Sequence, residues 1–270
     1  MAMEKDFNIF PEIMGILNVT PDSFSDGGNY FDKNFAVKHA LALIQDGADI
    51  IDIGGESSRP SANPVSTKDE IKRIIPVIEK LKRLVPGCII SVDTTKYDVA
   101  AAALDAGAGI INDISGLQFD ERLASLAAVK SAGLVIMHIN GTPQTMQKNP
   151  VYNDVVQDVY DFLNSKVSIA AAAGVKNIYI DVGIGFGKTL KHNLALLKNI
   201  DVFTSIDAKI LLGISRKSFL GTLTGINNPE ERDTATVLFH ALLLGNSINV
   251  IRVHDVKLLK MLKTLYKSLL

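Results

Sequence analysis

This chain of 270 residues has one cysteine, no long apolar run and almost no net charge. Cys88 is the single cysteine, so no intramolecular disulfide can form; we expect a small buried residue inside an apolar strand, in a reducing cytosol. No apolar run approaches the roughly 20 residues that cross a bilayer. The formal net charge is -1, so composition indicates neither a nucleic-acid-binding surface nor an acidic tail.

The N-terminal segment MAMEKDFNIFPEIMGIL has no basic region followed by an apolar stretch and a cleavage site, so we expect no signal peptide and a cytoplasmic location. Hydrophobic residues make up 47% of the chain, which allows a large core. The length is close to the roughly 250 residues of one (β/α)₈ barrel. We therefore expect residues 1–270 to form a single domain.

Eight short apolar stretches recur along the chain, and each ends in a polar residue or loop. A strand that is buried on both faces is apolar throughout, so these stretches are typical of parallel strands. In a closed barrel, all the polar ends fall on one rim, where a single ligand can touch several of them. The stretches are EIMGILN, ADIIDIGGES, CIISVDT, GIINDIS, LVIMHI, IYIDVG, ILLGISRK and VIRVHD, and their polar ends include Asn18, Glu56, Asp93, Asn112, His138, Asp181, Lys217 and Arg252.

Helical periodicity fills the segments between these stretches, and the alternation predicts βαβ units. Eight consecutive units favour an α/β fold of the (β/α)₈ TIM barrel type over an open doubly wound sheet, which stays the alternative. The last segment, KLLKMLKTLYKSLL, is basic and amphipathic and could lie on a membrane, but an outer barrel helix also needs an apolar face. The helical segments are 33–46, 68–84, 96–106, 120–131, 152–173, 190–199, 229–245 and 255–268.

The segment GIGFGKT, residues 183–189, superficially resembles a phosphate-binding P-loop. The P-loop pattern requires glycine where this chain has Val182, and the glycine spacing also misses the dinucleotide-binding pattern. We interpret the segment as a loop whose glycines allow close approach of backbone, with Asp181 at its base.

Polar residues at the strand ends divide by their chemistry. Asp93 and Asp181 can accept paired hydrogen bonds from an aminopyrimidine edge, and Asn112 beside Asp113 adds a donor and acceptors. For each carboxylate alone, a structural helix cap or ion pair is the alternative. The site therefore suits a nitrogen heterocycle.

Three potential cations close the last two strands, where such barrels often bind phosphate. They are Lys217, Arg252 and His254, and they indicate an anionic group on the ligand. The amide oxygen of Asn18 could hold Mg²⁺ together with phosphate oxygens. No histidine pair has the spacing of a zinc site, and no Ser-His-Asp or Cys-His arrangement indicates covalent catalysis.

The motifs ILNVTPDSFSDGG, DIGGESSRP, SVDT, IINDISG, MHINGTPQTMQ, GIGFGKT, ISRKSFLG and IRVHD together resemble the dihydropteroate synthase family over residues 12–255. The resemblance implies a folate-pathway transferase, often a homodimer, that joins 6-hydroxymethyl-7,8-dihydropterin diphosphate to p-aminobenzoate, with Mg²⁺ as cofactor and sulfonamides as competitors. Both substrates are small molecules, and no nucleic-acid or membrane partner is expected.

The resemblance also implies roles for individual residues. The pterin contacts are Asp93, Asn112, Met137, Asp181, Phe186 and Lys217; the diphosphate and Mg²⁺ site is Asn18, Arg252 and His254; Ser218 contacts p-aminobenzoate; and two closing loops carry Asp22, Phe24 and Asp26 and then Ser58, Arg59 and Pro60. Lys217, Asp93, Arg252 and His254 would be catalytic.

The chain departs from the family pattern at three places. Ser58 and Ser61 lie in the motif that usually reads GGESTRPG, Val182 replaces a proline, and MHINGTP replaces MHMQGTP. Two other functions remain alternatives: a pterin-dependent methyltransferase domain that serves a corrinoid partner, and a pterin-binding paralogue without catalysis. Both are disfavoured, because the DSFSDGG loop and the RVH end are present and Asn18, Lys217, Arg252 and His254 are intact.

Overall fold

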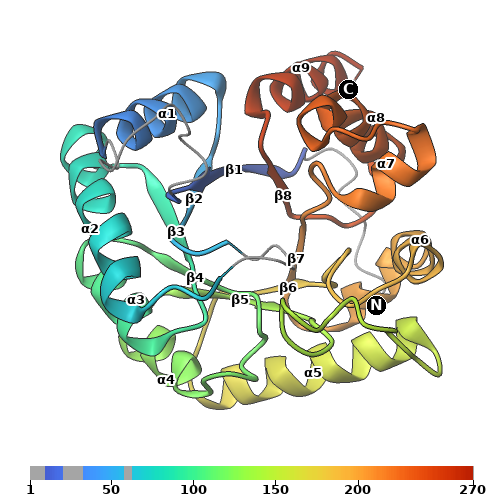
Figure 1. The fold of residues 1–270 in the computed structure, drawn as a ribbon, viewed down its shortest axis with the longest axis horizontal. Coiled ribbons are helices and arrows are strands. Elements are labelled where there is room, and N and C mark those ends of the chain that lie inside the picture. The colour runs from blue at the N-terminus through green and yellow to red at the C-terminus, as the bar shows by residue number, and fades with distance from the viewer. Residues whose placement is uncertain (1–9, 21–32, 58–62, 270) are drawn as a thin grey trace.

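Eight parallel strands form a closed barrel in the chain order β1 to β8, and helices surround it (Figure 1). The structure is a computed structural model that describes residues 10–20, 33–57 and 63–269. The closed barrel confirms the predicted TIM barrel and excludes the open sheet. The strands are β1 (Glu12–Asn18), β2 (Ile50–Gly54), β3 (Ile89–Asp93), β4 (Ile110–Asp113), β5 (Gly133–Met137), β6 (Ile178–Asp181), β7 (Lys209–Leu212) and β8 (Val250–Val253).

The eight predicted helical segments are all present, with one divided. Residues 229–245 split into a short 3₁₀ helix, η3 (Pro229–Arg232), and α8 (Asp233–Leu243). Two further elements were not predicted, α7 (Ser218–Thr224) and the 3₁₀ helix η2 (Ile200–Ser205). The remaining helices are α1 (Lys33–Asp46), α2 (Thr67–Leu84), α3 (Tyr97–Asp105), α4 (Arg122–Val129), α5 (Val155–Ala172), α6 (Leu190–Lys198) and α9 (Val256–Lys267).

The sequence of α2 shows why such a segment becomes an outer helix. The Ser66 side chain caps its N-terminus by accepting a hydrogen bond from the Asp69 backbone N–H at 3.1 Å. Its apolar residues recur at helical spacing, so they share one face, and that face is buried against the barrel. The buried apolar residues are Ile74, Val77, Ile78 and Leu81.

Residues that point into the barrel form an apolar floor with a polar layer above it. The floor takes one side chain from each of seven strands: Met14, Ile50, Ile110, Val135, Tyr179, Leu211 and Val250. Side chains two positions further along a strand lie on the same face, nearer the C-terminal rim. Those positions include Asp52, Asn112, Met137, Asp181 and Arg252. The polar strand ends of the sequence are thus the upper part of a filled barrel.

Cys88 departs from the sequence prediction, whereas the basic last helix fits the barrel as expected. Cys88 lies one residue before β3 rather than inside it, and it is half-buried rather than fully buried. The basic last helix, α9, packs Val256 and Leu259 into the core, as a barrel helix does. In the described part of the chain, no helix combines the length and apolar character that crossing a membrane requires.

Candidate active site

Arg252 lies at the centre of the polar layer. It donates from Nε to Asp52 Oδ2 at 2.6 Å and from Nη2 to Asp93 Oδ2 at 2.9 Å. The same Asp52 oxygen accepts a hydrogen bond from Asn112 Nδ2 at 3.0 Å. A single network thereby connects β2, β3, β4 and β8 across the barrel mouth.

Burial changes the proton affinity of this network. It raises the pKa of the Asp93 carboxyl to about 7; the charge of Arg252 opposes this rise and that of Asp52 adds to it. Asp52 Oδ1 and Ser91 Oγ, on residues paired between β2 and β3, are buried without a hydrogen-bond partner among the described residues. Unpaired buried polar atoms are costly, so a ligand or solvent group that hydrogen-bonds to them is favoured here.

Asp181, at the end of β6, is 5% exposed and accepts a hydrogen bond from the Gly183 N–H at 2.7 Å. Burial raises its pKa, and the charge of Lys217 opposes the rise. Its second oxygen faces Gly213, where an added Cβ would lie 3.5 Å away. The absence of a side chain at position 213 therefore leaves space beside this carboxylate.

The loop after Asp181 confirms the interpretation of GIGFGKT as a close-approach segment. Gly183 and Gly187 have φ values of +68° and +67°, in the left-handed region that glycine adopts readily. A Cβ at Gly183 would overlap the carbonyl oxygen of His138, and one at Gly187 would lie 2.9 Å from the carbonyl oxygen of Asn140. Glycine is thus required by both conformation and space.

Lys217 extends from the loop after β7 over this glycine segment. Its Nζ donates to the carbonyl oxygen of Ile184 and lies 4.5 Å from the centroid of the Phe186 ring. Burial lowers the pKa of Lys217 to about 8, while the negative charge of Asp181 opposes this effect. The ammonium group is therefore close to its titration range near neutral pH.

His254 and Asn18 occupy the opposite side of the mouth, near the junction of β8 and β1. The His254 ring nitrogen Nδ1 lies 2.9 Å from Ser215 Oγ, and the His254 N–H donates to that hydroxyl at 3.1 Å. Asn18 is the last residue of β1. A Cβ added to Gly54 would lie 3.9 Å from Asn18 Oδ1, and the Asp93 side chain faces the same glycine. Asn18 and Asp93 therefore adjoin the same small space.

The remaining predicted residues fall at different depths. Met137 is buried in a small apolar cluster against which Phe186 packs. Ser218 is the exposed first residue of α7. Asp113 is not in the site, because β4 alternation turns it outward, where its carboxylate accepts hydrogen bonds from Ser115 and Leu117. The predicted loop residues Asp22, Phe24, Asp26, Ser58, Arg59 and Pro60 lie outside the described residues.

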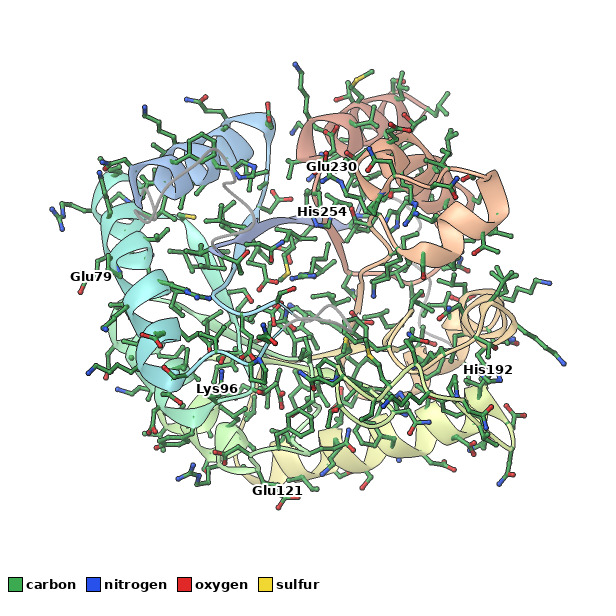
Figure 2. All side chains as sticks on the ribbon, in the orientation of Figure 1. Glu79, Lys96, Glu121, His192, Glu230 and His254 are labelled. Carbon is green, nitrogen blue, oxygen red and sulfur yellow. The ribbon has the colours of Figure 1, made fainter. Side chains whose placement is uncertain are left out.

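Glu56, which had no assigned role, belongs to an ion cluster beside the second loop. Lys96 Nζ contacts both Glu56 Oε2 and Glu70 Oε2, the latter at 2.6 Å, and it donates to the Val65 carbonyl at 2.9 Å. The Val65 N–H donates in turn to Glu56 Oε1 at 3.1 Å. Lys96 therefore joins the two described flanks of the loop. Figure 2 shows it at the start of α3, across the barrel from His254.

His138 had no assigned role either, and it forms a buried pair with Lys188. Lys188 Nζ lies 2.8 Å from His138 Nδ1 and donates to the Phe186 carbonyl at 3.1 Å. Burial, together with the positive charge of Lys188, lowers the pKa of His138 to about 3. The neutral imidazole thus accepts from Lys188, which secures the glycine loop from beneath.

Sequence reasoning missed Asp52, Ser91, Lys96 and Lys188 as members of the site or its support. Asp52 had a usable signal, because it interrupts the apolar strand IIDIG two residues after the floor residue Ile50. A charge at an inward position of a buried strand needs a partner, and the register points it at the mouth. Lys96 and Lys188 gave no such signal, since lysines in loops are usually solvated.

Comparisons with known proteins agree with this geometry. The family model described as "Pterin binding enzyme" matches residues 14–254. A dihydropteroate synthase of Streptococcus pyogenes is 46% identical over 248 residues, which cover 91% of this chain and 90% of the relative. A solved Xanthomonas albilineans dihydropteroate synthase with 4-aminobenzoic acid aligns with a TM-score of 0.89 at 40% identity, covering 96% of this chain and 93% of that one.

A third comparison is a Yersinia pestis dihydropteroate synthase solved in complex with a sulfonamide drug. It aligns with a TM-score of 0.88 and 38% identity over 96% of this chain and 94% of its own. These relatives favour the synthase over the methyltransferase alternative. With its pterin-type carboxylate layer, its cationic strand ends and this degree of identity, the chain belongs to the dihydropteroate synthase family of transferases.

Proposed function

We propose that this chain condenses 6-hydroxymethyl-7,8-dihydropterin diphosphate with p-aminobenzoate to give 7,8-dihydropteroate and diphosphate. The observation that carries the proposal is the convergence of Asp93, Asn112, Asp181 and Lys217 on one barrel mouth that also holds Arg252. Carboxylates beside a lysine suit a pterin ring, and a guanidinium suits its diphosphate.

The pterin binds on the side of β3 to β7. Asp181 and Asp93 accept hydrogen bonds from the N–H groups of the aminopyrimidine edge, and Lys217 donates to the ring carbonyl. The side-chain N–H of Asn112 is engaged by Asp52, so its Oδ1 is the atom turned to ligand donors. Met137 and Phe186 supply the apolar contacts for the flat ring.

The diphosphate binds on the side of β8 and β1. Arg252 is fixed by two carboxylates before the substrate arrives, so little reorganisation is needed when negative charge develops on the leaving group. His254, oriented by Ser215, completes this anion contact with Asn18. The two halves of the substrate are therefore recognised by opposite sides of the mouth.

Magnesium is the proposed cofactor, and the donor set fits a hard ion shared with the substrate. The described residues contain no group of three or more His, Cys, Asp or Glu side chains that would cage a metal. Mg²⁺ commonly takes one or two protein oxygens and completes its shell with phosphate oxygens and water. Asn18 would provide that oxygen. Bound there, the ion would neutralise charge on the diphosphate.

The chemistry follows from the leaving group. The methylene C–O bond breaks with its electron pair on diphosphate, the ring delocalises the positive charge that remains, and the arylamine nitrogen forms the new C–N bond and loses one proton. A neutral aniline needs no strong base to attack. The residues Asp22, Phe24 and Asp26, with Ser58, Arg59 and Pro60, are proposed to close over this centre and exclude water.

Ser218 is proposed to contact p-aminobenzoate, since it begins α7 directly after Lys217 at an exposed position of the rim. A sulfonamide resembles this substrate in shape, so we expect it to compete with p-aminobenzoate and not with the pterin. The single-domain organisation and the cytoplasmic location expected from the sequence stay predictions.

A homodimer is proposed, and an apolar groove between α7 and α8 supports it. Leu223, Leu238 and Leu242 line the groove and are 48%, 63% and 79% exposed. Such a surface is costly in a monomer. Light scattering should show a dimer in the native protein and a monomer in Leu238→Glu; a native monomer would contradict the proposal.

The deciding experiment measures diphosphate release at varied Mg²⁺, with and without p-aminobenzoate. The synthase proposal expects formation of dihydropteroate in step with diphosphate. A steady-state rate of diphosphate release that is the same with and without p-aminobenzoate would contradict the synthase proposal. We also propose that the C–O bond breaks before the C–N bond forms. If pre-steady-state release of diphosphate strictly requires p-aminobenzoate, this order is wrong, although the overall reaction stays the same.

A further inference from the structure

Arg216 adopts an uncommon backbone conformation between two site residues. Its φ is +59°, in the left-handed region that non-glycine residues rarely adopt because their Cβ crowds the backbone. Ser215 precedes it and hydrogen-bonds with His254, while Lys217 follows it and lies over Phe186. The kink at Arg216 therefore sets the directions of both neighbours.

Residues of η3 and α8 bind both the backbone and the side chain of Arg216. Its N–H donates to Thr236 Oγ1 at 3.1 Å, and its carbonyl accepts from Arg232 Nη1 at 3.0 Å. Its guanidinium forms a two-point fork with Asp233, from Nε to Oδ1 at 2.8 Å and from Nη2 to Oδ2 at 2.6 Å. Backbone and side chain are thus tied to one short stretch of chain.

Arg232 is itself held in place. It is 8% exposed and also donates to the carbonyl oxygens of Ile226 at 2.9 Å and Asn227 at 2.5 Å. A Cβ at Gly221 would lie only 2.7 Å from its Nη2, so α7 has glycine where this guanidinium passes. The support beneath Arg216 is therefore buried, well hydrogen-bonded and closely packed.

The fork also separates the roles of two adjacent cations. The SRKS motif presents Arg216 and Lys217 side by side in sequence, and both could serve an anionic ligand. The left-handed kink sends them to different surroundings: Arg216 to the carboxylate of Asp233, and Lys217 to the glycine loop and the vicinity of Asp181.

We propose that Arg232, Asp233 and Thr236 form a clamp that holds Arg216 in its left-handed conformation, and that these four are positioning residues for Lys217 and for His254 through Ser215. The inference rests on the proposed function for its kinetic consequence. Without the clamp, residue 216 relaxes to an ordinary conformation, which turns Lys217 away from Asp181 and moves the hydroxyl of Ser215 from His254.

Two substitutions at position 216 test this directly. Arg216→Ala and Arg216→Gly both remove the fork, but glycine adopts positive φ without support. We expect Arg216→Ala to lower kcat/KM for the pterin diphosphate roughly 10-fold to 100-fold, the scale of misplaced catalytic groups. Arg216→Gly should retain several-fold more activity than Arg216→Ala. In an Asp233→Ala background, adding Arg216→Gly should likewise recover activity.

Arg122 provides a matched control, because it forms the same fork with Asp120, at 2.9 and 2.6 Å, on the outside of the barrel. Arg122→Ala and Arg122→Gly should both leave kcat/KM unchanged. The melting temperature of every variant is measured, since glycine in place of alanine loosens the unfolded chain. Equal activities for Arg216→Ala and Arg216→Gly, or activity that simply follows melting temperature, would overturn the clamp.

Hydrogen exchange separates this proposal from the proposed function. The Lys217 N–H donates to the Ile214 carbonyl at 3.3 Å, and we expect its exchange to accelerate in Arg216→Ala and less in Arg216→Gly. If the native protein had no synthase activity, the proposed function would be wrong, but the hydrogen-exchange rates would still test the clamp. Unchanged exchange at residues 215–218 in Arg216→Ala would remove the clamp whatever the native activity.

Discussion

Arg252 Nε lies 2.6 Å from Asp52 Oδ2, although 200 positions separate the two residues in the chain. Asp52 is fully buried and Arg252 is 21% exposed, so the pair forms part of the barrel interior as well as the mouth. Buried ion pairs add little net stability when intact, but removing one partner leaves an uncompensated charge. The contact therefore connects substrate recognition to the integrity of the barrel.

Arg252→Ala should raise KM for the pterin diphosphate about tenfold or more, because the leaving group loses a charge-assisted contact. It should also lower the free energy of unfolding by about 3 kcal/mol, because Asp52 and Asp93 lose their cation. Steady-state kinetics and denaturant titration measure the two effects. Lys130→Ala, which breaks an exposed pair with Asp105, is the control and should cost no more than about 1 kcal/mol. An unchanged KM in Arg252→Ala would argue against its assigned role.

Lys217→Ala should abolish turnover while the protein stays folded, because the pterin loses its donor beside Asp181. Turnover and circular dichroism give the two readings. Lys209→Ala is the control: Lys209 also lies over an aromatic ring, 5.3 Å from the Tyr179 centroid, but at the start of β7 and away from the rim. Near-normal activity in Lys217→Ala would refute the role of this residue.

The pH dependence of kcat/KM should be a narrow bell. Asp93, with a pKa of about 7, must lose its proton to act as an acceptor, so activity rises through that value. Lys217, with a pKa of about 8, must keep its proton to donate, so activity falls above it. Lys217→Arg should move the alkaline limb upward by more than about one unit, since guanidinium stays charged. An alkaline limb that does not move in this variant would mean that another group controls it.

Lys96→Met should destabilise the protein by about 3 kcal/mol, because it leaves Glu70 buried without its cation. Burial already raises the pKa of Glu70, and Lys96 opposes that rise. Adding Glu70→Gln to Lys96→Met should recover part of the loss, as measured by denaturant titration. Lys72→Met serves as the control, because its pair with Asp69 is exposed at 3.7 Å. Equal effects of Lys96→Met and Lys72→Met would disprove a supporting role for the cluster.

Gly183→Ala should be far more damaging than Gly245→Ala. Both glycines have positive φ, but an added Cβ meets nothing within 4 Å at Gly245, whereas it overlaps the His138 carbonyl at Gly183. Gly245→Ala should cost about 1–2 kcal/mol of backbone strain. Gly183→Ala should cost more than that and should also weaken pterin binding. Calorimetry and ligand titration compare the two, and similar costs would show that the loop accommodates a side chain.

Much of this architecture is predictable from patterns in the sequence. Apolar strands with polar ends gave the barrel and its rim, because both depend on local periodicity. The direction of a side chain depends on register and long-range pairing: Asp113 neighbours Asn112 in sequence yet faces outward, while Asp52 faces the site from within a strand. The helix break at Arg232 was equally invisible, since local periodicity does not show that this side chain donates to the carbonyl oxygens of Ile226 and Asn227 in the loop before it.

The pairing of β1 with β8, which closes the barrel, also has a consequence for synthesis of the protein on the ribosome. β8 pairs with both β7 and β1, so the first and last strands of the barrel meet. A nascent chain that ends before Val250 already contains Asp93, Asn112 and Asp181, but it has no guanidinium for Asp52 and no closed ring. The complete mouth is therefore assembled only after β8 has been translated, and products that end before Val250 lack the side of the mouth that carries Arg252 and His254.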